Sequence, residues 1–292
     1  LSMRGSMRFQ MGDNKYKDDT KLTRLGRKPD AYYGIMNPPI VRASTIQYPD
    51  LETYETKKGQ KYRYGNIGHP LSDEFEQVMA ELEGGYACVS SSTGLAPISA
   101  SLLAFTKSGD HVLMCDSVYP PTRYFCSRVL KRYGVEVEYY DPVIGAGIED
   151  LIKDNTSVIY LESPGSATFE VQDVPAITAV AKEHGIITVA DNTFATPYNQ
   201  KPLSFGFDIV MHSATKYING HSDVVGGVLV TKDQTLGEEL AWWANCIGIT
   251  GSPFDSYLAL RGLKTLPIRM KQHQENADVV GKFLKAHTAI EA

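Results

Sequence analysis

The chain of 292 residues has only four cysteines, and they form neither a C-x-x-C pair nor a spacing typical of zinc sites. Its lysines and arginines form no basic block, so nothing indicates binding to nucleic acid or to an anionic membrane. The longest apolar runs, at 158–161 and 226–230, are far shorter than the ~20 residues of a membrane-spanning helix. No G-x-G-x-x-G motif opens the first strand–helix unit, which argues against a dinucleotide-binding dehydrogenase.

The overall composition is that of an ordinary globular protein. Hydrophobic residues make up 42% of the chain and charged residues 22%, and the length suits one large or two modest domains. Three of the four cysteines, Cys88, Cys115, Cys126 and Cys246, lie in apolar surroundings, so we expect reduced core thiols and a cytoplasmic location. The start, LSMRGSMRFQ, has no apolar signal-peptide core and is typical of vector-derived sequence before a native start near Met11.

Short apolar runs alternate with helical patterns from residue 71 onward. One helix face is formed by Phe75, Val78, Met79 and Leu82, and the helix should end at Gly84. We expect strands at 112–115, 135–139, 158–161, 186–190, 209–212 and 224–230. We expect helices at 96–105, 124–132, 174–184 and 236–245, and a long helical stretch from about residue 263. This alternation predicts an α/β fold with a mostly parallel sheet flanked by helices.

The composition and pattern of the chain indicate three segments. Residues 1–64 are polar and punctuated by prolines, and we expect a tag remnant followed by an extended N-terminal arm. Residues 65–262 would form the large α/β domain, and residues 263–292 would begin a C-terminal domain. The chain stops soon after a helix without a closing element, so we expect this smaller domain to be truncated.

Two polar segments stand where an open α/β sheet binds ligands, beyond the carboxyl ends of its strands. The small residues at 90–95 lead into a helix whose first N–H groups would suit a phosphate, although such residues more often serve as ordinary helix caps. Asp191 directly follows a buried strand, where it either caps the next turn or holds a positively charged ligand nitrogen.

The third segment contains Lys216, which follows an apolar strand and has Ser213 and Thr215 beside it. Most lysines are solvated, but burial here would lower the pKa of the amine from about 10.4 and make it a nucleophile for a carbonyl cofactor. The joint pattern matches the needs of pyridoxal 5'-phosphate (PLP), because its phosphate, ring nitrogen and aldehyde require a donor loop, a carboxylate and a lysine.

The sequence resembles the Cys/Met-metabolism family of fold-type-I PLP-dependent enzymes from about Gly34 to its end. The segments that carry this resemblance are YRYGNIGHP, AELEGG, SSTGLAPISASLLAF, DSVYPPT, ESPGSATFEVQDVPAI, ADNTFATP, SATKYINGHSDVVGG and ALRGLKTLPIRMKQH. The resemblance implies a fold-type-I α/β architecture, PLP as the cofactor, no metal, and a homo-oligomer that is at least a dimer and typically a tetramer.

The resemblance also implies a role for each matching position. Lys216 would carry PLP as a Schiff base, Asp191 would pair with the pyridinium nitrogen, and Tyr119 would stack on the ring and assist catalysis. The residues implied for the phosphate are the backbone amides of Gly94 and Leu95, the hydroxyls of Ser213 and Thr215, and Tyr64 of a neighbouring subunit.

Two further positions depart from common patterns. Asn66 stands where the family usually has an arginine, which removes a charge-assisted contact to the phosphate. No residue can be matched to the family arginine that binds the substrate carboxylate, since that residue belongs to the C-terminal domain.

His69, His212 and His221 are not at metal-ligand spacing, and we expect structural roles for them.

Finer detail within the resemblance points to the cystathionine β-lyase branch. After the stacking tyrosine, γ-lyases and γ-synthases typically have Gly-Gly or Gly-Cys, whereas this chain has Pro120 and Pro121. After the Glu-Ser-Pro segment they have Thr-Asn-Pro, whereas this chain has Gly165 and Ser166. The branch implies cleavage of L-cystathionine to homocysteine, pyruvate and ammonia. A γ-lyase or γ-synthase activity, and a non-catalytic PLP-binding oligomer, remain alternatives.

Overall fold

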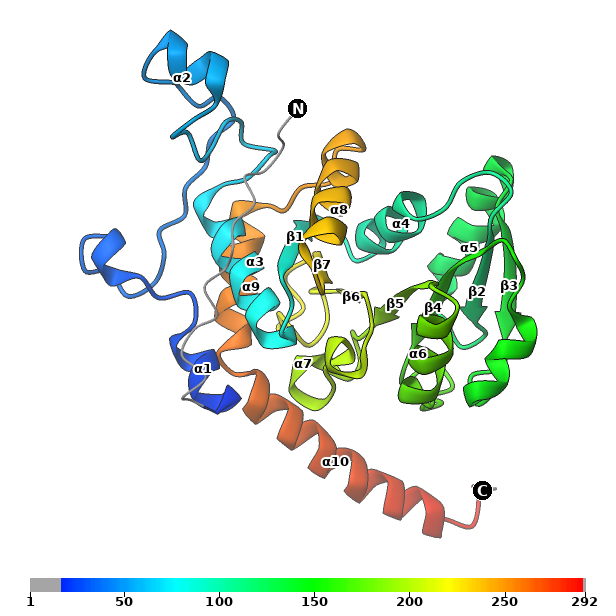
Figure 1. Ribbon diagram of the computed structural model, residues 1–292. Helices are drawn as coiled ribbons and strands as arrows, with labels where there is room; N and C mark the ends of the chain where they lie inside the picture. Colours follow the sequence, from blue (N-terminus) through cyan, green and yellow to red (C-terminus); the bar gives the residue numbers. More distant parts are fainter. Residues whose placement is uncertain (1–16, 291–292) are drawn as a thin grey trace.

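The computed structural model describes residues 17–290, so the expected tag remnant and Met11 lie outside the described residues. A seven-stranded sheet has the order β1-β7-β6-β5-β4-β2-β3 (Figure 1). The strands are β1 (Ala87–Ser91), β2 (His111–Cys115), β3 (Glu136–Tyr140), β4 (Thr156–Glu162), β5 (Ile187–Asp191), β6 (Ile209–His212) and β7 (Gly227–Thr231). Strands β2 to β6 pair in parallel, while β7 is antiparallel to β1 and β6. The predicted mostly parallel sheet is confirmed.

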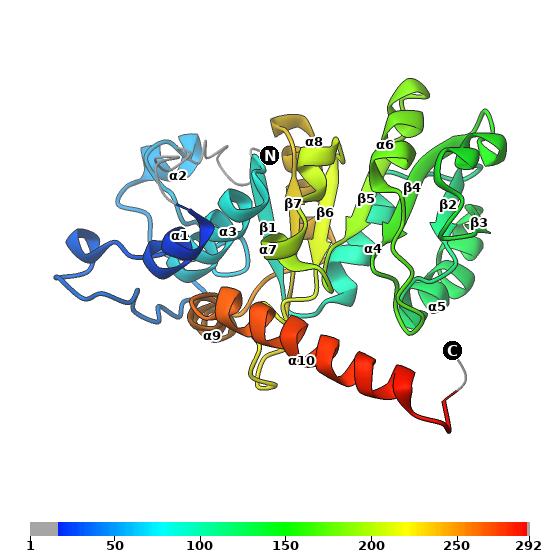
Figure 2. The ribbon, with the colours of Figure 1, turned by 90° about the horizontal axis from the view of Figure 1, so that it is seen from below.

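The central strands are mostly apolar, with polar residues at their ends, because both faces of the sheet are covered. Strands β2 and β6 are buried at every residue. Helices α4 and α5 lie on one side of the sheet and α6 on the other (Figures 1 and 2). The thiols of Cys88, Cys115 and Cys126 are buried as expected, and Cys246 is exposed.

The helices of the body begin and end close to the predicted residues, except that the helix expected at 124–132 lies at 120–128 and the short helix at 196–199 was not predicted. They are α3 (Pro70–Glu83), α4 (Leu95–Ala104), α5 (Pro120–Arg128), α6 (Val174–Glu183), α7 (Thr196–Asn199) and α8 (Gln234–Cys246). Helix α3 ends at Gly84, whose φ of 73° is the left-handed conformation that glycine adopts without strain. Helix α6 is capped by Asp173, which accepts a hydrogen bond from the backbone N of Ala176 at 3.2 Å.

The N-terminal arm contains more structure than its sequence predicts. Helix α1 (Asp18–Arg24) packs Leu22 into a hydrophobic cluster with α3, so this part is anchored to the body. Helix α2 (Leu51–Thr56) buries no residue and lies at the far end of the arm in Figure 1. The expectation of an arm without regular structure is therefore wrong for 18–24 and 51–56, because apolar contacts and the Asp50 cap stabilise short helices there.

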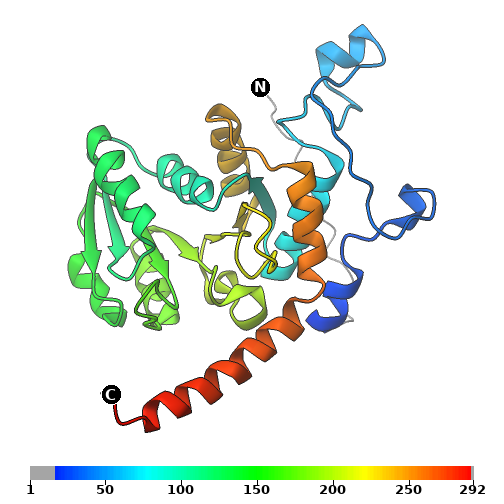
Figure 3. The same cartoon turned by 180° about the vertical axis from the view of Figure 1, so that it is seen from behind.

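The C-terminal part consists of α9 (Pro253–Leu263) and α10 (Leu266–Ala286). Figure 3 shows α10 running away from α9 past the rest of the molecule. Only the first turns of α10 are buried, at Leu266, Pro267 and Met270, while Val279 and Phe283 are exposed. Within residues 17–290, no helix is both long and apolar enough to cross a bilayer.

Candidate active site

The carboxyl ends of β4, β5 and β6 bring the site together. Because these strands are parallel neighbours, their last residues lie at one edge of the sheet. Asp191 ends β5, pairs in register with Glu162 of β4 and Met211 of β6, and is only 5% exposed. The turn that contains Lys216 follows β6 directly.

Asp191 is connected to the turn after β6 through Thr193. The backbone N of Thr193 donates to Oδ1 of Asp191 at 3.0 Å, and Oγ1 of Thr193 accepts from the backbone N of Ser213 at 2.8 Å. Burial raises the pKa of Asp191, while the hydrogen bonds from Thr193 and the nearby His212 oppose that rise. A buried carboxyl with so few partners suits a positively charged ligand atom.

Behind Asp191 lies a buried polar network that the sequence did not reveal. Nε2 of His212 lies 2.6 Å from Oε1 of Glu83, and both side chains are fully buried. The side-chain amide of Asn192 donates to the same Oε1 at 3.1 Å. The expected structural role of His212 is consistent with this pair, which links the end of α3 to the ends of β5 and β6.

The two segments predicted to bind the phosphate, around Gly94 and around Ser213, lie in contact in the structure. Gly94 caps α4 and lies against Ser213, because a Cβ atom on Gly94 would stand 2.8 Å from the Cβ of Ser213. The first N–H groups of α4 have no partner within the helix and point toward its N-terminus, and that of Ala96 donates to Oγ1 of Thr93 at 3.2 Å. Backbone donors and the Ser213 hydroxyl therefore converge on one small region.

Thr215 and Lys216 depart from expectation in detail. Oγ1 of Thr215 donates to the carbonyl of Gly226 and accepts from its N–H, both at 3.1 Å, so a phosphate would have to replace a bond that is already made. Lys216 is exposed in this chain, and its expected burial is wrong here. The residue lies in the turn that follows β6, where Gly220 donates to its carbonyl at 2.7 Å, and this turn leaves the Lys216 side chain exposed.

Tyr119 stands at the start of α5 and is 40% exposed, with its backbone N donating to Oε2 of Glu162 at 2.7 Å. Glu162 is the residue that the sequence analysis missed. It is 6% exposed, its Oε1 lies 2.5 Å from Oγ of Ser166, and burial together with Asp191 raises its pKa to about 8. The signal was present, because Glu162 follows the apolar run 158–161 as Asp191 follows 186–190.

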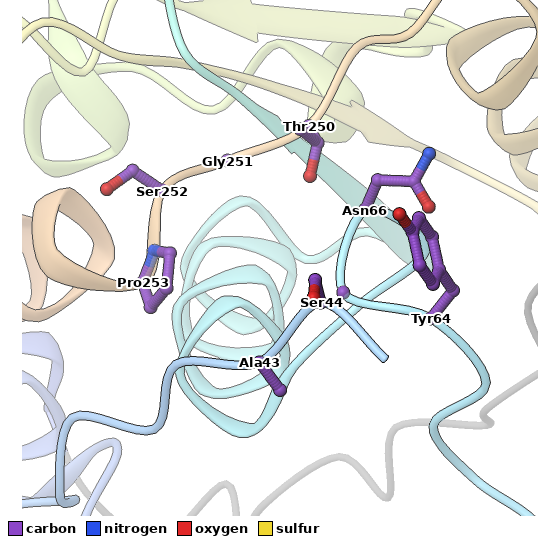
Figure 4. Close-up of a pocket in the computed structure, with 9 residues that line it drawn as sticks. Ala43, Ser44, Tyr64, Asn66, Thr250, Gly251, Ser252 and Pro253 are labelled. Carbon is purple, nitrogen blue, oxygen red and sulfur yellow. The ribbon is translucent and has the colours of Figure 1, made fainter. Parts of the chain in front are cut away.

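Tyr64 lines a recess that the other predicted site residues do not share. It is 48% exposed and lines a recess of about 380 Å³ between the arm and residues 250–253 (Figure 4). Asn66 lines the same recess, whereas Asp191, Ser213 and Lys216 do not. The role of Tyr64 at the site of a neighbouring subunit stays a prediction.

One cluster of possible metal ligands lies away from this site, within the described residues. His111, Glu136 and Glu138 meet near the amino ends of β2 and β3. The amine of Lys153 already lies between the two carboxylates, at 3.0 Å from Glu136 and 2.7 Å from Glu138. These contacts are sufficient to explain the cluster as an ion-pair network.

Comparison with known proteins then decides the family. Residues 19–292 match the family described as Cys/Met metabolism PLP-dependent enzyme. The chain belongs to this family. Membership implies PLP as the cofactor, and it confirms the resemblance on which the sequence analysis relied.

Individual members of the Cys/Met-metabolism family show how close the relation is. The chain is 46% identical over 267 residues to a Rhizobium johnstonii protein named as a candidate cystathionine beta-lyase, covering 91% of this chain and 67% of the relative. It is 39% identical over 277 residues to cystathionine gamma-lyase of Bacillus subtilis, covering 94% and 71%. The structure of cystathionine gamma-lyase from Lactobacillus plantarum complexed with L-serine matches with a TM-score of 0.90 at 37% identity, covering 95% and 71%. The fold-type-I architecture is confirmed.

The strand-end residues of this family member fit PLP. Asp191 would offer a buried carboxyl to a cationic ring nitrogen, and Gly94 approaches Ser213 this closely only because residue 94 has no side chain. Lys216 lies on the turn that begins at Ser213, and Tyr119 lies at the start of α5. The site therefore has groups suited to the ring nitrogen, the phosphate and the aldehyde of the cofactor.

Proposed function

We propose that this chain is a PLP-dependent carbon–sulfur β-lyase that cleaves L-cystathionine, with water, to homocysteine, pyruvate and ammonia. The observation that carries the proposal is the placement of Asp191, Ser213 and the Lys216 turn at one edge of the sheet, against the glycine at the start of α4. The cofactor supplies an electron-withdrawing ring that labilises the Cα–H and Cβ–S bonds of a bound amino acid.

The proposed roles of the protein groups follow from their chemistry. Asp191 holds the ring nitrogen in its protonated form, since a buried carboxylate next to it favours the cation. Nζ of Lys216 holds the cofactor covalently and then takes the Cα proton of the substrate. The hydroxyl of Tyr119 or Nζ of Lys216 returns a proton to the departing sulfur.

The choice of β-lyase rests on the residues that surround the Glu-Ser-Pro segment. A Cβ atom on Gly165 would collide with Oγ of Ser117, so the threonine that γ-lyases typically carry there does not fit without a shift. Pro120 and Pro121 occupy the first turn of α5 directly after Tyr119, where proline is well tolerated. The R. johnstonii relative, whose name gives a candidate β-lyase, supports the same assignment at 46% identity.

The decisive assay supplies L-cystathionine to the PLP-loaded protein and identifies the keto acid that is released. Pyruvate with homocysteine is the expected product, whereas 2-oxobutyrate with cysteine would establish a γ-lyase. A yellow protein that forms neither keto acid would favour a non-catalytic PLP-binding oligomer. Lys216→Ala should abolish turnover, and Lys182→Ala, which removes an exposed lysine of α6, is the matched control.

We also propose that the protein acts in the cytoplasm as a homo-oligomer, at least a dimer and typically a tetramer. Reduced buried thiols support the location. The position of Tyr64 supports the assembly, because it lines a recess that Asp191, Ser213 and Lys216 do not line, as expected if it serves the phosphate of another subunit. Light scattering of the purified protein measures the assembly, and Tyr64→Phe should weaken PLP binding if the assignment is right.

A further inference from the structure

Glu162 occupies a central position between two residues proposed to flank the cofactor ring. It pairs in register with Asp191 on the neighbouring strand, and its Oε2 accepts the backbone N–H of Tyr119 at 2.7 Å. Its own exposure is 6% and that of Asp191 is 5%, so the two carboxyls share a region that water hardly reaches. Two carboxylates at paired positions in such a region repel strongly.

The ionisable neighbours of Glu162 differ in whether they carry a charge near neutral pH. Cys115 on β2 accepts the backbone N–H of Glu162 at 3.2 Å, and burial raises its pKa to about 12. Tyr160 is fully buried on β4, and burial raises its pKa well above the ordinary value. Cys115 and Tyr160 are therefore neutral near neutral pH. Of these three neighbours, only Asp191 competes with Glu162 for a negative charge.

We propose that Glu162 is protonated at neutral pH and acts as the positioning residue that aligns Tyr119 with Asp191 around the cofactor ring. With the proton on Oε1, that oxygen would donate to Oγ of Ser166, which lies 2.5 Å away, and Oε2 would still accept the backbone N–H of Tyr119. One proton on the pair leaves a single negative charge on Asp191, which matches the single positive charge of a protonated ring nitrogen. The inference rests on the proposed function, since it assumes that the ring lies between these residues.

The first test follows the proton in the protein without cofactor. The infrared band of a buried protonated carboxyl should disappear from the wild-type apo-protein as the pH rises through about 8. Glu162→Gln should lack this band, and Glu183→Gln, which changes an exposed glutamate of α6, should retain it. A wild-type spectrum without a protonated carboxyl at neutral pH would overturn the proposal, whatever the cofactor does.

The second test asks whether the neutral form is what the site needs. An amide oxygen accepts the Tyr119 N–H as a neutral carboxyl does, so Glu162→Gln should bind PLP within about threefold of wild type and keep the induced circular dichroism of the bound cofactor. Glu162→Asp is one methylene too short to reach Tyr119, and together with Glu162→Ala it should bind PLP about tenfold more weakly.

The outcomes distinguish failure of the Glu162 proposal from failure of the proposed function. If Glu162→Gln binds PLP as poorly as Glu162→Asp, a carboxylate rather than a neutral acceptor is required, and the proposal is wrong. If Glu162→Ala does not fold, the comparison of Gln with Asp still decides. If wild type binds no PLP at all, the proposed function fails, while the infrared titration independently reports whether Glu162 holds a proton.

Discussion

Gly94 and Ser213 touch across the sheet: a Cβ atom on Gly94 would lie 2.8 Å from the Cβ of Ser213. These residues follow β1 and β6, which are separated by β7 in the sheet, so the contact joins two loops over a third strand. A glycine is needed at this point because any side chain would displace the turn that begins at Ser213 and contains Lys216.

Gly94→Ala should therefore loosen the site. We expect a loss of about 1–3 kcal/mol in the free energy of unfolding from overpacking, and PLP affinity lowered about tenfold or more as the turn shifts. Chemical denaturation and fluorescence titration with PLP measure the two effects. Gly281→Ala is the control, since nothing lies within 4 Å of a Cβ atom at that position of α10. Equal PLP affinity of Gly94→Ala and wild type would refute the phosphate assignment.

The buried pair of Glu83 and His212 should contribute strongly to stability. Glu83→Ala removes the partner of Nε2 of His212 and one of the two acceptors of the Asn192 amide in a buried region, at an expected cost of about 3 kcal/mol. The chain contains a matched pair at the surface, Glu149 and His184, at 3.4 Å. Glu149→Ala should change the free energy of unfolding by less than about 0.5 kcal/mol. Similar losses for both variants would show that burial does not decide the effect.

The raised pKa of Glu162 makes stability depend on pH. Between its ordinary value of 4.5 and about 8, the folded state holds a proton that the unfolded state has released. The stability of the apo-protein relative to Glu162→Gln should therefore fall as the pH rises across this window, by about 1.4 kcal/mol per unit at most. Urea denaturation of both proteins at several pH values measures the difference. A difference that stays constant over the window would contradict the raised pKa.

Tyr119→Phe separates stacking from proton transfer. The ring remains, so PLP affinity should stay close to that of wild type, whereas loss of the hydroxyl should lower kcat by about 10²-fold if it protonates the departing sulfur. Tyr124→Phe changes an exposed tyrosine of the same helix and should leave kcat unaltered. An unchanged kcat in Tyr119→Phe would assign the proton to Lys216 alone.

The sequence predicted the elements whose patterns are local. Strand β6 has the predicted bounds, and α3 ends at the predicted glycine, because apolar runs and helix caps depend on neighbouring residues. Strand β1 was missed from Ala87 onward, since its small and polar residues give no apolar run, and its pairing with β7 is a contact across about 140 residues of chain. Helix α1 was missed for the same reason, as it is stabilised by packing against α3.

Within the site, residue type and position after a strand were enough to select Asp191, Ser213 and Lys216. The same criterion would have selected Glu162, but not its contact with the backbone N–H of Tyr119, which only the fold brings within hydrogen-bonding distance. The exposure of Lys216 was likewise not predictable, since a one-dimensional pattern cannot tell whether a turn is covered by other elements.

The central claim is that Lys216 carries the cofactor, and trapping the bond tests it most directly. The PLP-loaded protein is reduced with borohydride, digested, and its modified lysine located by mass spectrometry. We expect the PLP label on Lys216 and no label on Lys182 or in the Lys216→Ala variant. A label on a different lysine, or none in a protein saturated with PLP, would contradict the account.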